Sequence, residues 1–262
     1  MKPSEVTASL LVYASLAFAG PVLAADVCQK YGPQTPRDIT KTDGKNPRTF
    51  ALAPPSRAMN LCNIHFHTNA EHKGPGYAVF AGKGEHGGYK CNDSAKLSKA
   101  ELTSPEHAAC HGVKAGDTIE VHWVFTSCDV APGKGLGACL SAQCANPTLR
   151  VEAQVFLVVN NPKADDFAKY VYAGNVVQGV HQPKALPART GKPVVFPGST
   201  TGPSYTDAKC SPMQVTWSVR PACAKIDINS INKWCQGNVF EENHAHGVRA
   251  LVTAPELLAK IK

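Results

Sequence analysis

The chain has 262 residues and a formal net charge of +7, from 27 Lys and Arg against 20 Asp and Glu. The basic residues are scattered, without a Lys/Arg run or a basic stripe interleaved with aromatic residues, which argues against nucleic acid as a partner. Beyond the first two dozen residues, no stretch is apolar enough to span a membrane.

The N-terminus has the pattern of an export signal. Lys2 is followed by an apolar run at 8–18 and then by the small residues Ala24 and Ala25. We expect a signal peptide at 1–24, cleavage after Ala24, and a secreted or periplasmic product without a membrane anchor. The alternative, an uncleaved anchor, is disfavoured because the run is too short to span a bilayer as a helix. The remaining roughly 240 residues fit one large domain or two small ones.

Short alternating runs bounded by Gly, Pro or Asn dominate this remainder and predict strands separated by turns. The expected strands are 62–68, 118–125, 151–159, 192–196 and 214–219. A Gly/Cys-rich stretch at 126–147 predicts a long loop pinned by disulfides. We expect one helical turn at 167–170 and a short helix at 254–261, within one mainly-β domain.

Ten cysteines follow the signal, and no two of them form a C-x-x-C pair. An even number in an exported chain favours disulfides over zinc thiolates.

Two histidines of the first strand are candidate metal ligands. Alternate residues of a strand share a face, so Asn63, His65 and His67 point the same way. Residues two apart stand about 6.6 Å from each other along a strand, so the two imidazoles can converge on one ion. By itself an H-x-H pattern is equally typical of two half-exposed strand histidines without a metal.

The second strand offers a third imidazole. Its odd-numbered residues from 119 to 123 are apolar, while Glu120 and His122 share the opposite face. If the two strands are neighbours, His122 completes three nitrogen ligands and leaves one tetrahedral position to water, which is typical of catalytic zinc. Metal-bound histidines donate their second N–H to an acceptor, a role available to Glu120 and to Asn63.

His72, next to Glu71, is expected to be structural. The other six histidines lie among Gly, Pro and Lys, or in the pattern H-A-H without apolar alternation. We expect solvated loop positions for the first kind and no metal at the second. They are His86, His107, His111 and His181, and the pair His244 and His246.

Four segments resemble the carbonic anhydrases, specifically the delta class, whose active site looks like that of the alpha class. G-P-Q-T-P-R-D-I at 32–39 is similar to the alpha-class Q-S-P-I-D-I. N-I-H-F-H at 63–67, continuing to A-E-H at 70–72, is similar to H-F-H and E-H, and E-V-H-W at 120–123 to the third-ligand strand. P-G-S-T-T-G-P at 197–203 with V-T-W at 215–217 is similar to G-S-L-T-T-P-P and V-T-W, and all four occur in the family's order.

The resemblance implies an alpha-carbonic-anhydrase-like fold. This is a mainly-β (α+β) single domain, here 25–262, with a large central twisted, mostly antiparallel sheet, long loops and a few short helices. It also implies one Zn²⁺ per chain, held by His65, His67 and His122. The implied reaction is the reversible hydration of carbon dioxide to bicarbonate and a proton by a zinc-bound hydroxide.

The resemblance also implies roles around the ion. Thr201 accepts the hydrogen bond of the hydroxide and donates its own to Glu71. Val124, Val215 and Trp217 are expected in the apolar wall that holds carbon dioxide. Glu152 stands where the resemblance expects an apolar pocket residue.

The chain departs from the alpha pattern in two places. Gly202 follows Thr201 where a second Thr is expected, so Thr200 is an alternative for the same role. No G-H-S segment precedes the first ligands, so the alpha-class proton-transfer histidine has no counterpart, and another loop histidine or buffer is left for that task. Cys28 and Cys210 flank the matching segments like the disulfide of exported alpha enzymes, which implies a Cys28–Cys210 pair.

Two alternatives stay open at this point. His65, His67 and Glu71 match the first metal-binding motif of cupins, which use iron or manganese. The second cupin motif would have to include His122, but the Pro-x-Gly of that motif is missing here. The other alternative is a carbonic anhydrase-like binding module that has lost catalysis. Such a loss usually follows from a missing ligand histidine, and all three ligand histidines are present here. The sequence does not determine the oligomeric state. The signal peptide leads us to expect a role in supplying bicarbonate outside the inner membrane.

Overall fold

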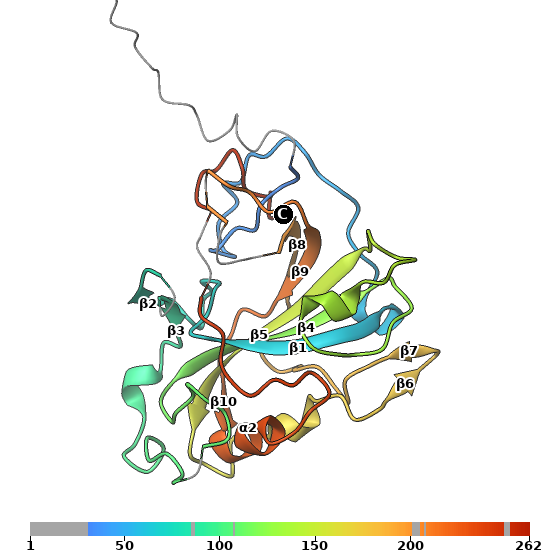
Figure 1. Ribbon diagram of the computed structural model, residues 1–262. Helices are drawn as coiled ribbons and strands as arrows, with labels where there is room; N and C mark the ends of the chain where they lie inside the picture. Colours follow the sequence, from blue (N-terminus) through green and yellow to red (C-terminus); the bar gives the residue numbers. More distant parts are fainter. Residues whose placement is uncertain (1–30, 85–86, 107, 201–204, 207, 249–251) are drawn as a thin grey trace, which may run out of the picture.

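The computed structural model describes residues 31–262 except 85–86, 107, 201–204, 207 and 249–251. A six-stranded twisted sheet has the strand order β1-β4-β5-β9-β8, with β10 also paired to β5 (Figure 1). Its pairs β1–β4, β4–β5 and β8–β9 are antiparallel, while β5–β9 and β5–β10 are parallel. The strands are β1 (Asn60–Thr68), β4 (Thr118–Thr126), β5 (Leu149–Val159), β8 (Val194–Ser199), β9 (Gln214–Val219) and β10 (Ala224–Asp227).

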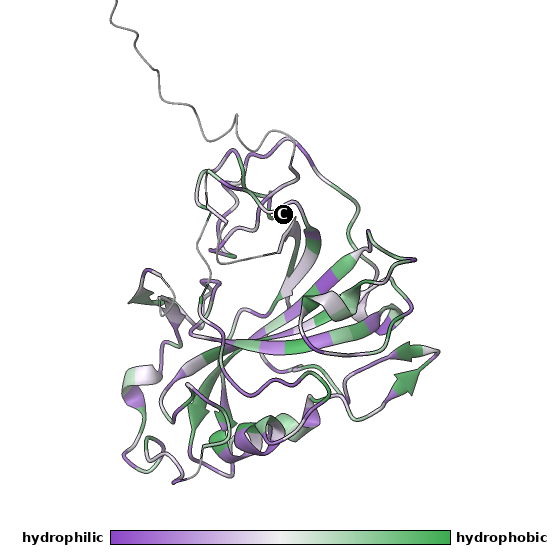
Figure 2. Cartoon of the chain, viewed as in Figure 1, coloured by the Kyte–Doolittle hydropathy of each residue, from purple (hydrophilic) through white to green (hydrophobic). Residues whose placement is uncertain are grey.

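All five predicted strands are present in this sheet, as β1, β4, β5, β8 and β9. Residues of opposite polarity alternate along β1, which changes repeatedly between hydrophilic and hydrophobic in Figure 2. Alternation is informative here because successive side chains of a strand point to opposite faces of the sheet. The expected mainly-β architecture with a large central sheet, long loops and few helices is confirmed.

Short elements surround the sheet. Two hairpins stand apart from it, β2 (Val79–Gly82) with β3 (Gly88–Lys90), and β6 (Val176–Val177) with β7 (Val180–His181). Four 3-10 helices and one α-helix complete the described part of the chain. They are η1 (Ser56–Ala58), η2 (Ser94–Lys96), η3 (Leu136–Cys139), η4 (Phe167–Lys169) and α2 (Ile228–Cys235).

The predicted helical turn at 167–170 is confirmed by η4, whereas the predicted helix at 254–261 is wrong. This segment makes a turn at 255–257 and then pairs with the N-terminal part of the chain. Gln34 donates its N–H to the carbonyl of Leu257 and accepts from the N–H of Ala259. Backbone groups that bond to another segment are not available for a helical ladder.

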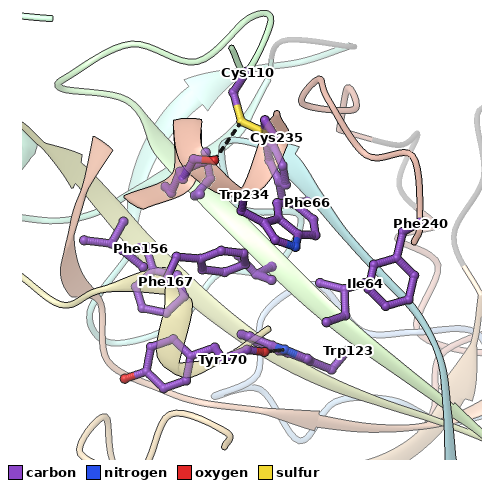
Figure 3. Close-up of a cluster of buried hydrophobic side chains, with 14 of the residues drawn as sticks. Ile64, Phe66, Cys110, Trp123, Phe156, Phe167, Tyr170, Trp234, Cys235 and Phe240 are labelled. Atoms are coloured by element: carbon purple, nitrogen blue, oxygen red, sulfur yellow. Dashed lines mark hydrogen bonds between the residues drawn. A yellow bond between two sulfur atoms is a disulfide. The ribbon is translucent and has the colours of Figure 1, made fainter. Parts of the chain in front are cut away.

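Helix α2 covers one face of the sheet. Its apolar residues Ile228, Ile231 and Trp234 are spaced three apart and are buried. Figure 3 shows Trp234 among the aromatic side chains of this core, with Phe66 from β1 and Phe167 from η4 close by. The opposite face of the sheet carries a second core cluster, in which the candidate site lies.

Four disulfides cross-link the described residues: Cys62–Cys139, Cys91–Cys223, Cys110–Cys235 and Cys128–Cys144. Two of them hold the 126–147 loop, as its composition predicted. Cys28 lies outside the described residues, so the Cys28–Cys210 pair stays a prediction. Within the described ranges, no helix is long and apolar enough to cross a membrane.

Candidate metal centre

The antiparallel pairing of β1 with β4 brings the three predicted ligands together. His65 lies directly opposite His122 in the register, and His67 follows two positions along β1 on the same face. His67 and His122 are buried, and His65 is half-buried. One ring nitrogen of each histidine lies within 4.8 Å of those of the other two.

The spacing of one pair of these nitrogens fits a tetrahedral ion. His65 Nε2 and His122 Nδ1 lie 3.3 Å apart. Two nitrogens bound to zinc at about 2.05 Å, at a tetrahedral angle, are also separated by about 3.3 Å. The ring centroids of the three histidines are 4.9 to 5.2 Å apart, so each ring adjoins the other two. Three ligands leave one tetrahedral position over.

Acceptors hold the outer nitrogens of the two β1 histidines. Asn63 Oδ1 lies 2.7 Å from His65 Nδ1. The carbonyl oxygen of Gly247 lies 3.0 Å from His67 Nδ1. An acceptor at the outer nitrogen places the ring proton there and leaves the inner nitrogen with its lone pair for a metal. Asn63 therefore lies where it was expected, whereas Gly247 acts through its backbone, which no side-chain pattern reveals.

Glu120 supports the third ligand. Its Oε1 lies 3.5 Å from His122 Nε2 and 2.7 Å from His72 Nδ1, and its Oε2 accepts from the backbone N–H of Glu71 at 2.6 Å. Burial raises the pKa of Glu120, but the neighbouring His72 and His122 outweigh burial and hold that pKa well below its usual range. An ionised carboxylate at the outer nitrogen of His122 makes this imidazole a stronger metal ligand.

Glu71 is fully buried beside the cluster. Its Oε1 lies 3.7 Å from His67 Nδ1, and its Oε2 lies 3.8 Å from Arg37 Nη1. Burial raises the pKa of Glu71, but His67 and Arg37 more than offset this, and the net pKa is lowered. Burial also lowers the pKa of His67 to about 4, so its imidazole is neutral at neutral pH, as a metal ligand must be.

Thr200 and Thr201 differ in what the structure says of them. Thr201 lies outside the described residues, so its hydrogen bond to Glu71 stays a prediction. Thr200 lines the cavity beside the histidines, with its Oγ1 2.8 Å from Ser211 Oγ and its N–H donated to the carbonyl of Met213. The choice between the two threonines therefore stays open.

A cavity of about 270 Å³ adjoins the three histidines. The expected wall residues Val124, Val215 and Trp217 all line it, together with further apolar residues: Leu136, Leu149, Val151 and Phe240. Trp217 also packs against the ring of His122, with centroids 5.2 Å apart. A mainly apolar cavity with a few convergent polar groups is typical of a small-molecule site.

Glu152, which the resemblance placed at a pocket position, does not line this cavity. Its carboxylate pairs with Arg150 at 2.7 Å and with Arg220 at 3.2 Å. The neighbouring Val151 lines the cavity instead, since adjacent residues of β5 face opposite sides.

The second H-x-H pattern forms part of the cavity wall, which sequence reasoning missed. Glu242, His244 and His246 all line the cavity. The backbone of His246 bonds to β1, donating to the carbonyl of Phe66 and accepting from the N–H of Thr68. In the sequence, only the H-A-H pattern itself pointed to this segment. The residues around it do not alternate in polarity, so no strand next to the metal site was predicted there.

Two of the remaining histidines, His111 and His181, do not line the cavity. His111 is exposed, and His181 is half-buried with its Nδ1 2.8 Å from the hydroxyl of Tyr172. His86 and His107 lie outside the described residues. Among the described residues, the His/Cys/Asp/Glu clusters that could hold a metal are the three ligands and the overlapping set of His72, Glu120 and His122.

A mixed β-sheet that presents three imidazoles to an apolar cavity defines a class, a mainly-β protein with a candidate catalytic metal centre. Comparison with known proteins then gives the family. The profile described as Delta carbonic anhydrase matches residues 56–230, more than half of the chain. The chain belongs to the delta carbonic anhydrase family and is a carbonic anhydrase. Because the chain belongs to this family, the cupin alternative is wrong. The family implies carbon dioxide and bicarbonate as the substrates.

Among solved structures, an alpha-carbonic anhydrase from Thermovibrio ammonificans, in complex with the inhibitor sulfanilamide, is similar to this chain. The identity is 15%, with 88% of this chain and 91% of that chain covered, at a TM-score of 0.30. A likeness of this strength supports no conclusion about this chain. The comparison with curated proteins gives no match.

Proposed function

We propose that the chain catalyses the zinc-dependent, reversible hydration of carbon dioxide to bicarbonate and a proton. The observation that carries the proposal is the convergence of the ring nitrogens of His65, His67 and His122 beside an apolar cavity. The nitrogens lie within 4.8 Å of one another, and one pair has tetrahedral spacing. Membership of the delta carbonic anhydrase family supports the same reaction.

The donor set suits Zn²⁺. Three neutral imidazoles with one position left over are the ligand set of a catalytic zinc site. His65, His67 and His122 would hold the ion. Zinc bound in such a site lowers the pKa of a bound water to about 7, as is known for carbonic anhydrase, and so supplies a hydroxide nucleophile at neutral pH.

The surrounding residues would fix the ligands and complement the charge of the ion. Asn63 and the carbonyl of Gly247 hold the outer nitrogens of His65 and His67, so these two rings keep one tautomer and one orientation. The Glu120 carboxylate lies 3.5 Å from the outer nitrogen of His122 and favours a proton there. The buried carboxylates of Glu71 and Glu120 lie next to the cluster and favour a dication over a neutral occupant.

The cavity wall would hold the substrate. Carbon dioxide has no net dipole, so the apolar surface of Val124, Val215 and Trp217 gives it a site in which water competes weakly. Thr201 is proposed to donate its hydroxyl hydrogen to Glu71. A hydroxyl that donates to a carboxylate can only accept from the nucleophile, which aims the remaining lone pair of the nucleophile at the substrate.

The test measures metal and activity on the same sample. We expect one zinc per chain by mass spectrometry, with stopped-flow hydration of carbon dioxide that is lost on chelation and restored by zinc. His122→Ala should lose both the zinc and the activity. His111→Ala, which changes an exposed histidine that does not line the cavity, should keep both. Iron or manganese in place of zinc would contradict the proposal, and zinc without hydration would indicate the non-catalytic binding module.

We also propose that residues 1–24 are a signal peptide and that residues 25–262 form the mature catalytic domain, secreted or periplasmic. The four disulfides support an oxidising compartment. An enzyme placed there would supply bicarbonate outside the inner membrane.

A further inference from the structure

One wall of the cavity carries imidazoles that bind no metal in the proposed function. His246 is held in place, because its Nε2 lies 2.9 Å from Glu242 Oε1 and its backbone is bonded to β1. His244 follows at the rim, where it is exposed and still lines the cavity. The two rings are in edge-to-face contact, with centroids 4.7 Å apart.

The proposed hydration reaction needs a group that carries protons out of the cavity. Each hydration turnover releases one proton in a cavity whose wall is largely apolar, and that proton has to reach solvent before the next turnover. The three histidines proposed as ligands would not be available for this task, because their inner nitrogens would hold the metal. The outer nitrogens of His65 and His67 face acceptors at 2.7 and 3.0 Å, and that of His122 faces the buried Glu120 carboxylate at 3.5 Å. An imidazole that exchanges protons near neutral pH and touches both the cavity and solvent meets the requirement.

The hydrogen bonding of His244 leaves one of its nitrogens available. Its Nδ1 lies 3.0 Å from Asn243 Oδ1, so the neutral ring carries its proton on Nδ1 and keeps a lone pair on Nε2. The adjacent segment approaches through its backbone, since Ala245 donates its N–H to the carbonyl of His111.

The charged groups around this rim are already paired. Glu242 binds His246, and the neighbouring Glu241 accepts from Lys134 at 2.7 Å. The exposed ring of His111 lies on the adjacent segment and does not line the cavity.

We propose that His244 carries the proton between the cavity and bulk solvent, an inference that rests on the proposed hydration reaction. Cavity water passes the proton to Nε2 of neutral His244, which becomes an imidazolium. The imidazolium then releases one proton to a buffer base and returns to the neutral ring. In the first step an N–H bond of His244 forms as an O–H bond of the donating water breaks. In the second step an N–H bond breaks as the buffer base binds the proton.

The test compares His244→Ala with His111→Ala, two exposed histidines on paired segments, in the zinc-loaded chain. In weak buffer we expect His244→Ala to lower kcat by about tenfold or more, and His111→Ala to leave it unchanged. The value of kcat/KM should stay within about twofold, because proton release follows the departure of bicarbonate. Added imidazole should restore kcat of His244→Ala, which a merely structural defect would not allow. The zinc content and the melting temperature should match those of the unsubstituted chain.

A second measurement does not depend on activity. Long-range ¹H–¹⁵N spectra of the metal-free chain should show the proton of neutral His244 on Nδ1, and Asn243→Ala should shift the tautomer towards Nε2–H. An active chain in which His244→Ala keeps full kcat in weak buffer, or in which imidazole has no effect, would overturn the inference and leave the proposed function intact. An unsubstituted zinc-loaded chain without hydration activity would instead refute the proposed function.

Discussion

At the scale of single residues, the outer nitrogen of each ligand histidine meets an acceptor of a different kind: an amide, a backbone carbonyl and a carboxylate. Of the three acceptors, Asn63 is the most suitable for substitution. Its partner His65 is the least buried of the three candidate ligands, so the surrounding core is disturbed least. The amide of Asn63 also donates to the carbonyl of Gly133 at 3.0 Å and so links β1 to the 126–147 loop.

We therefore expect Asn63→Ala to weaken zinc binding by about 10- to 100-fold, because the His65 ring loses the acceptor that fixes its tautomer. Competition with a chromogenic chelator measures the Kd. Asn46→Ala removes another buried asparagine, one whose amide bonds to the carbonyl of Leu257 instead, and should leave the Kd unchanged. An equal loss in both variants would mean that Asn63 acts through stability alone.

Val124 tests the substrate wall. Its side chain is buried, lines the cavity and belongs to β4, two residues after His122. Val124→Phe should lower kcat/KM by at least about tenfold with zinc retained, because the larger ring occupies the space proposed for carbon dioxide. Val195→Phe, at an exposed position of β8, is the control for added bulk. Unchanged kcat/KM in Val124→Phe would place the substrate elsewhere.

At the scale of elements, β1 and the 126–147 loop hold each other through the Cys62–Cys139 disulfide. Cys139 ends η3, which begins with the cavity residue Leu136. This cross-link therefore supports both the sheet and one wall of the cavity.

Replacing both Cys62 and Cys139 by Ala should lower the free energy of unfolding by about 4.5 kcal/mol, since the bridge spans 77 residues. Replacing Cys128 and Cys144, which are 16 residues apart, should cost about 3 kcal/mol. Urea unfolding measures both values. The first pair should also reduce kcat/KM through the displaced Leu136. A larger loss from the shorter bridge would contradict the chain-entropy explanation.

Glu101 anchors β10 to the segment before β4. Its carboxylate accepts from Lys225 at 2.6 Å and from the backbone and hydroxyl of Ser98 at 3.0 and 2.9 Å. These bonds, with Lys225 as the largest contribution, lower the pKa of Glu101 to about 2. Because the folded-state pKa lies below that of the unfolded chain, the stabilisation is complete above about pH 4.5 and is lost as the pH falls towards 2.

Glu101→Gln should therefore be less stable than the unsubstituted chain at pH 7, and the difference should shrink as the pH falls from about 4.5 to 2. Unfolding curves at several pH values measure this difference. Lys96→Gln, which breaks an exposed ion pair with Asp93, is the control and should have little effect on stability at any pH. A difference for Glu101→Gln that does not depend on pH would show that its carboxylate does not act through its charge.

At the scale of the whole molecule, the expected export signal and the disulfides belong together, since disulfides form in oxidising compartments. Production in an exporting host should yield a mature chain that begins at Ala25, as measured by N-terminal sequencing. Peptide mapping without reduction should then contain the Cys28–Cys210 link together with the four bridges described above. A mature chain that keeps the apolar run at 8–18 would contradict both the cleavage and the localisation.

The elements that could be predicted are those whose polarity pattern is contained in a few consecutive residues. Five strands follow from alternation, and the ligand face of β1 follows from the same period of two. Helix α2 was missed because its eight residues are too few for a clear period, and it is stabilised by packing of Ile231 and Trp234. The hairpins were missed for the same reason, since their strands β2, β3, β6 and β7 have only two to four residues each.

The sequence by itself determined which residues can serve as ligands and which strands carry them, because the face of a strand is encoded in adjacent positions. Only the tertiary structure decided that His65 faces His122, that Gly247 holds His67, and that the 242–246 segment lines the cavity. These contacts join residues far apart in the chain. Their formation depends on how all the elements pack together, which no local pattern encodes.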